Sequence, residues 1–180
     1  MSKNQKKLSE ILVGKAFKVG RFEFIKFADE NGVVTAVSRA CLFNSAFGSN
    51  NNFTNSDILK KLTDKILSEI ERIVGDENVL EFKTDLLSLD GSSKHGTVMS
   101  KISIPTFDFY RQNRAVFEKH KVDEWWWLAT PDSTSEYTND KWCVCVGPSG
   151  DIGSDYFYYG GDGVRPILNF VSSIFVSCDE

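Results

Sequence analysis

The chain has 180 residues, of which 41% are hydrophobic and 26% are charged, and 21 Lys and Arg against 25 Asp and Glu give a formal charge of −4. This length and composition predict one globular domain over residues 1–180 and exclude a disordered chain, a coiled coil and collagen. The acidic balance argues against a general or sequence-specific nucleic-acid binder, whose phosphate contacts need clustered Lys and Arg.

The charge is distributed unevenly along the chain. Residues 1–26 carry seven basic and two acidic side chains, whereas residues 125–180 carry two basic and eight acidic ones. No apolar run approaches the roughly 20 residues that cross a bilayer, and no apolar stretch typical of a signal peptide follows the basic opening residues. We therefore expect a cytoplasmic protein without a membrane partner, in which residues 1–12 form a flexible or helical basic segment.

The first predicted element is a β-hairpin. In residues 22–27 aromatic side chains alternate with charged ones, residues 29–32 (Asp-Glu-Asn-Gly) suit a turn, and residues 33–37 are rich in valine. We expect one aromatic face of this hairpin to point into the core.

A long amphipathic helix is predicted next. From residue 57 to about residue 74 the apolar side chains recur at steps of three and four. Asn55 or Ser56 is expected to cap this helix, and Gly75 is expected to end it.

The middle of the chain continues with a short strand over residues 82–89 and a polar loop over residues 92–100. The hydroxyl of Thr106 can cap a second amphipathic helix, which we expect over residues 107–118.

The last third has an unusual composition. Residues 125–180 hold all four tryptophans and four of the five tyrosines. Short strands are predicted at residues 125–129, 141–147, 150–159 and 164–170, and together they suggest one small antiparallel sheet. Residues 155–160 show no alternation, so some of their rings are expected to face solvent. Clusters of Tyr, Trp, Ser, Gly, Asn and Asp on loop-rich surfaces are typical of recognition sites.

The sequence shows no standard motif of a catalytic or metal site. Cys41, Cys143, Cys145 and Cys178 lack the spacing of a structural zinc site, although Cys143 and Cys145 would share one face of a strand. The chain has no nucleophile elbow, P-loop, dinucleotide fingerprint or H-E-x-x-H motif. We therefore expect no catalytic residue, no metal and no cofactor.

Three segments of the last third resemble a known family. Residues 126–131 read WWLATP, residues 146–152 read VGPSGDI, and residues 163–168 read GVRPIL. This order resembles the WWLR[ST]P…GVRP signature of a domain family of unknown function that occurs in Firmicutes and their phages. That family is similar to the C-type-lectin-like fold of formylglycine-generating enzymes and of the variable proteins of diversity-generating retroelements.

The resemblance implies a fold and a site. The implied fold is α+β and C-type-lectin-like, with two helices packed on small twisted antiparallel sheets, and Trp126, Trp127 and Arg165 belong to its structural framework. Ala129 stands where the signature has Arg, so an ion pair expected there is missing. The resemblance implies a ligand-binding surface, hypervariable in diversified relatives, built from residues 147–149, 151 and 153–162. The candidate ligand-binding residues are Tyr137, Asp140, Trp142, Ser149, Asp151, Asp155, Tyr156, Phe157, Tyr158, Tyr159 and Asp162.

Three functions are compatible with these observations. The first is a non-enzymatic module that binds a protein or a glycan through an aromatic and acidic surface. The second is a phage-encoded inhibitor of a host defence nuclease that mimics nucleic acid through its acidic residues. The third is a copper-dependent oxidase of the formylglycine-generating type that uses Cys143 and Cys145, whose spacing differs from that family's. The identity of the partner and the oligomeric state stay open.

Overall fold

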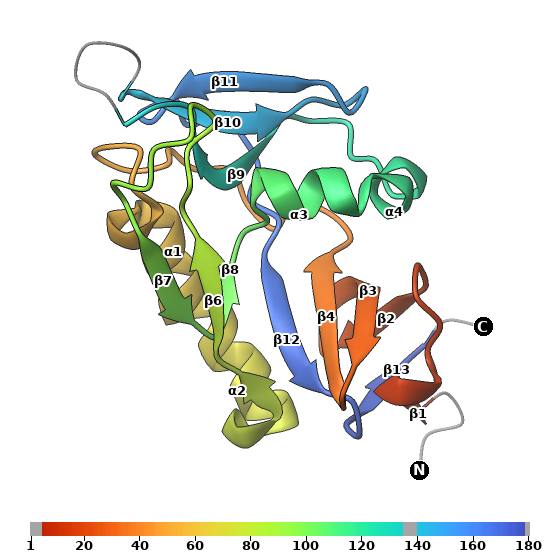
Figure 1. Ribbon diagram of the computed structural model, residues 1–180. Coiled ribbons are helices and arrows are strands. Elements are labelled where there is room, and N and C mark those ends of the chain that lie inside the picture. Colours follow the sequence, from red (N-terminus) through yellow and green to blue (C-terminus); the bar gives the residue numbers. More distant parts are fainter. Residues whose placement is uncertain (1–4, 135–139, 179–180) are drawn as a thin grey trace.

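The computed structural model describes residues 5–134 and 140–178 (Figure 1). Strands predominate and helices are few, so the expected α+β class is confirmed. Tyr137, a predicted site residue, lies outside the described residues.

A large antiparallel sheet joins segments from both ends of the chain. Across the sheet its strands are β1 (Gln5–Lys7), β13 (Phe175–Ser177), β2 (Ala16–Val19), β3 (Phe22–Glu30), β4 (Val33–Ser38), β12 (Ile167–Val171) and β5 (Val79–Leu80), and β8 (Ile102–Ser103) also pairs with β12. Residues 5–7 of the predicted flexible or helical segment are thus a strand, and one 3₁₀ turn follows at Leu8–Glu10.

The predicted hairpin is formed by β3 and β4. Asn31 and Gly32 have φ values of +52° and +82°, which suit a tight turn. The prediction that only one face of the hairpin points into the core was wrong, because both faces of β3 are covered. Phe22 and Phe24 pack into one core, whereas Ile25 and Phe27, which alternate onto the opposite face, pack into a second core.

The long predicted helix is present with its expected ends. It consists of α1 (Asp57–Lys61), a π-helical turn (Leu62–Leu67) and α2 (Ser68–Val74). Ser56 is the cap, because its Oγ accepts a hydrogen bond from the Leu59 N–H at 3.0 Å. Gly75 ends the helix with a φ of +92°.

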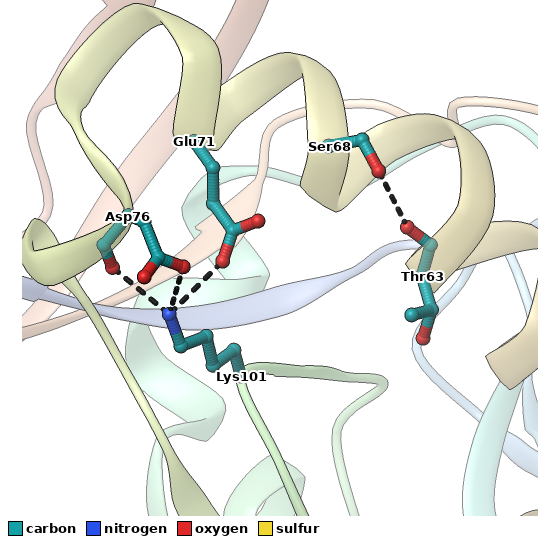
Figure 2. Close-up of polar contacts among 5 residues, drawn as sticks. All are labelled: Thr63, Ser68, Glu71, Asp76 and Lys101. Carbon is teal, nitrogen blue, oxygen red and sulfur yellow. Dashed lines mark hydrogen bonds and ion pairs between the residues drawn. The ribbon is translucent and has the colours of Figure 1, made fainter.

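Polar contacts fasten this helical segment (Figure 2). Lys101, between β7 (Thr97–Ser100) and β8, donates from Nζ to Glu71 Oε1 at 3.0 Å and to Asp76. Within the segment, Ser68 Oγ donates to the carbonyl oxygen of Thr63 at 3.2 Å. The loop after β7 is therefore tied to the end of α2.

Two predictions for the middle of the chain were partly wrong. The strand expected over residues 82–89 ends early, as β6 (Phe82–Asp85), and its partner β7 comes from the expected polar loop. β7 forms because its residues alternate, with Val98 packed against the core and Met99 exposed.

The second predicted helix is broken into α3 (Phe107–Gln112) and α4 (Arg114–Lys119). Its cap is as expected, since Thr106 Oγ1 accepts from the Phe109 N–H at 3.1 Å. At the break, Asn113 has a φ of −108°, and its side-chain Nδ2 donates to the carbonyl of Phe109 at 2.9 Å. The same carbonyl also accepts the backbone N–H of Asn113 at 3.1 Å, so the side chain adds a second bond where the helix breaks.

The predicted small sheet contains three strands, β9 (Trp126–Pro131), β10 (Trp142–Val146) and β11 (Ile152–Tyr156), in the order β11-β10-β9. The fourth strand expected there, at residues 164–170, belongs instead to the large sheet as β12. β12 pairs with β4 on one side and with β5 and β8 on the other. Its residues Leu168 and Phe170 are buried.

Candidate functional site

The candidate surface is built on the small sheet, whose two faces are covered along β10. Cys143 and Cys145 point into one core, and Val144 and Val146 point into the other. β11 pairs only with β10 among the described strands and forms the outer edge of the sheet (Figure 1). The loop after β11 returns the chain to the large sheet.

The three expected framework residues are buried. Trp126 and Trp127 lie on opposite faces of β9, one in each core. Arg165 donates from Nη2 to the carbonyl of Ser38 at 3.1 Å, and its guanidinium carbon lies 4.9 Å from the Trp126 ring centroid. Burial lowers the pKa of Arg165 to about 10. The cation therefore ties residues 38–39 to the inner face of β9.

The glycine of the GVRP segment is needed for close backbone contact. The Gly163 N–H donates to the Trp125 carbonyl at 2.8 Å, and its carbonyl accepts from the Trp127 N–H at 3.0 Å. A Cβ at this position would collide with Cys41. Ala129, at the departure from the signature, is fully buried in the core.

Three of the predicted rings form a stack at the end of the small sheet, which we call the aromatic stack: Trp142, Tyr156 and Tyr158. The ring centroids of Trp142 and Tyr156 are 3.9 Å apart, and those of Tyr156 and Tyr158 are 5.1 Å apart. Tyr158 and the neighbouring Tyr159 expose 62% and 48% of their surface. The outer rings are therefore available for contact, as the sequence predicted for part of this segment.

Phe157 has a different role from the tyrosines around it. It packs against the core, and its carbonyl accepts hydrogen bonds from the N–H groups of Phe47 at 2.8 Å and Gly48 at 3.2 Å. It anchors the segment to the loop before α1 and is a poor candidate for ligand contact.

The predicted acidic residues divide into displayed and buried groups. Asp151 is exposed, and the hydroxyl of Ser149 donates to it and lowers its pKa. Asp140 and Asp155 are half-buried, and Asp155 Oδ1 accepts from the Tyr156 N–H at 2.7 Å. These side chains lie at the two ends of β11 and in the turn that precedes β10.

The prediction that Asp162 is a surface residue that binds the ligand was wrong. Only 3% of its surface is exposed, and its Oδ2 atom has no hydrogen-bond partner among the residues that the structure describes. Burial and the negative charges of Asp155 and Glu124 raise its pKa to about 6. The sequence placed Asp162 in a glycine-rich turn, which does not reveal that the turn folds inward.

The sequence analysis missed Glu124 and Trp125. Trp125 is 39% exposed, and its ring lies so close to Gly147 and Gly153 that a Cβ at either glycine would come within 3.0 Å of it. Glu124 Oε2 accepts from Asn44 Nδ2 at 3.0 Å. Glycines at 147 and 153 leave room for a large side chain, and this could have indicated that Trp125 lies against them. The sequence does not show that contact, because it depends on how the strands pair.

A family model described as "Domain of unknown function (DUF6273)" matches residues 44–172. The chain belongs to this family. No curated protein matches the chain, and no solved structure matches it.

The family region includes all of the small sheet, and with it every described residue of the candidate surface. Strands β2 to β4 precede this region, although β4 pairs with β12 inside it. Among the described residues no helix combines the length and apolar character needed to cross a membrane.

Cys143 and Cys145 are both buried in this DUF6273 chain. Burial raises the pKa of both the Cys143 and the Cys145 thiol, so neither is a ready thiolate. Within residues 5–134 and 140–178, no three His, Cys, Asp or Glu side chains gather as a metal site would require.

Proposed function

We propose that the protein is a non-enzymatic binding module of the cytoplasm that presents an aromatic and acidic surface to a protein or glycan partner. The observation that carries this proposal is the exposure of Tyr158, the outer ring of the aromatic stack, and of its neighbour Tyr159, in the segment that follows Asp155. Exposed rings rimmed by polar groups are typical of recognition surfaces, because they provide contact area at a low cost in conformational entropy.

We also propose a C-type-lectin-like scaffold, with the phage or prophage origin and the variable loops that this resemblance implies. The burial of Trp126, Trp127 and Arg165 supports it, because these residues belong to the framework of the resembled signature. The residues between these framework positions then form the variable surface.

The test is capture of a partner from a lysate of the organism that encodes the protein, together with a glycan array. We expect the Tyr158→Ala/Tyr159→Ala variant to capture at least tenfold less ligand than the wild type and to keep the same melting temperature. Tyr156 is left intact, because its ring packs closely on Trp142. Phe175→Ala is the matched control, since Phe175 is 52% exposed on β13, away from the small sheet (Figure 1).

Acidic mimicry of nucleic acid is the second candidate function. Among the described residues, none of the ion pairs involves a carboxylate between residues 123 and 162. An inhibitor that docks on a basic nuclease surface should bind much more weakly in about 0.5 M salt, because salt screens long-range attraction. Binding that is insensitive to salt would contradict this candidate.

Copper-dependent oxidation through Cys143 and Cys145 gains no support from the site. Both thiols are buried in a core and face no third ligand of suitable type among the described residues. A Cys143→Ser/Cys145→Ser variant that is folded and keeps its binding would dismiss this hypothesis.

A further inference from the structure

The outer edge of β11 is open for hydrogen bonding. The Gly147 N–H donates to the Asp151 carbonyl at 2.9 Å, and the Phe157 N–H donates to the Lys141 carbonyl at 3.0 Å. Because bonded positions alternate in an antiparallel pair, residues 151, 153, 155 and 157 face β10. The N–H and carbonyl groups of the residues between them point away from the sheet.

Two of these outward residues have free backbone groups. Tyr156 is occupied, because its N–H donates to Asp155 Oδ1 at 2.7 Å and its carbonyl accepts from the Tyr159 N–H at 2.8 Å. The outward groups of Ile152 and Ser154 have no partner in the part of the chain that the structure describes. An open edge of this kind is a template for an added strand.

The charge beside this edge selects the kind of strand that could be added. Residues 122–164 contain eight acidic residues and one basic residue. Asp155 and Glu124 both lie near enough to the buried Asp162 for their charges to act on it, and none of the three forms an ion pair with a described residue. A second copy of β11 would bring like charges together, whereas Lys or Arg side chains would relieve the repulsion.

The side chains on one face of the edge fit a basic residue. Gly153 and Asp155 pair with Cys145 and Cys143, so they lie on the same side of the sheet. The half-exposed Trp125 ring covers Gly153 on this side. The ring fills the space over Gly153, so a cation beside the ring on this side would meet both a carboxylate and an aromatic surface.

We propose that the partner contributes an extended basic segment that pairs with Ile152–Tyr156 as an additional strand of the small sheet. This inference rests on the proposed binding function and names the chemistry of its ligand. Backbone hydrogen bonds to Ile152 and Ser154 hold the segment, and every second side chain, Lys or Arg, faces Asp155 and Trp125.

The probe for the test is a short fluorescent peptide of alternating Lys and Val, with a Glu and Val peptide of equal length as its control. Ser154→Pro removes an outward N–H and leaves the bonds between β10 and β11 in place. Met99→Pro is the matched control, because the N–H of Met99 points outward from β7, another edge strand of the described chain. Fluorescence anisotropy measures the Kd for each protein and peptide.

We expect the Lys/Val peptide to bind the wild type and the Met99→Pro variant equally, and Ser154→Pro to weaken binding at least tenfold. Asp155→Asn, which keeps an acceptor for the Tyr156 N–H, should weaken binding severalfold. Equal binding of the Glu/Val peptide, or equal binding by the Ser154→Pro variant, would overturn the proposal.

Hydrogen exchange on the wild type gives a result that does not depend on the folding of a variant. The saturating Lys/Val peptide should slow exchange of the Ile152 and Ser154 amides, and unchanged exchange would overturn the proposal. A lysate partner that is lost with Tyr158→Ala/Tyr159→Ala but kept by Ser154→Pro would overturn strand addition and leave the proposed binding function standing.

Discussion

At the scale of single residues, Asp162 is a buried carboxylate with an unpaired oxygen in the described part of the chain. Burial and the charges of Asp155 and Glu124 raise its pKa to about 6. The folded state then binds a proton more tightly than the unfolded chain does. Stability from this group is therefore greatest below the ordinary pKa of 3.8 and is lost as the pH rises from there to about 6.

Replacing Asp162 by Asn should stabilise the protein at pH 7.5. The gain is on the order of 1–3 kcal/mol, because a shift of one unit in pKa corresponds to about 1.4 kcal/mol, and it should shrink to less than half near pH 4.5, because the carboxyl group of the unfolded chain titrates at about 3.9. Urea unfolding of both proteins at the two pH values measures the difference. Asp151→Asn is the control: Asp151 is exposed and its pKa is lowered, so the change should give no stabilisation at pH 7.5.

At the scale of elements, local signals predicted most of what formed. The helix over residues 57–74 was predicted from the spacing of its apolar residues, and its cap from the polar residues that precede it. Both signals depend on neighbours within about one turn of the chain. The break at Asn113 was not predicted, because the pattern of apolar residues continues through it. The break coincides with the Asn113 side chain, which bonds to the Phe109 carbonyl beside the backbone N–H, and the apolar pattern does not reveal that contact.

Removing the cap should measure its contribution. Ser56→Ala leaves the Leu59 N–H without its acceptor, and the free energy of unfolding should fall by about 1 kcal/mol. Ser68→Ala is the control, because Ser68 is exposed within the helical segment and bonds only back to the Thr63 carbonyl (Figure 2). Its effect should be near zero, and an equal loss in both variants would contradict a capping role for Ser56.

At the scale of the whole molecule, the strand order could not be read from the sequence. Residues 164–170 predict a strand correctly, but their partner, β4, lies more than a hundred residues earlier in the chain. Asp162 was predicted to be displayed for the same reason, since only this return to the large sheet turns its side chain inward. Tyr158, Tyr159 and Asp151 were placed correctly on the surface because their glycine-rich surroundings favour exposure.

The same topology predicts how the family region behaves alone. A fragment of residues 44–172 lacks β2, β3 and β4, so β12 would lose the strand that pairs with Ile167–Val171. We expect the fragment to be unfolded or aggregated, whereas residues 5–178 should unfold cooperatively. Circular dichroism and thermal melting distinguish the two, and a cooperative transition in the fragment would contradict the prediction.

The central claim is that the rings beside β11 bind a partner and are not needed for the fold. The most direct measurement compares ligand capture by the wild type, Tyr158→Ala/Tyr159→Ala and Phe175→Ala, each with its melting temperature. The account predicts a ligand that is lost only in the tyrosine variant, with all three melting temperatures alike. Equal capture by all three proteins, or a collapse of stability in the tyrosine variant, would contradict it.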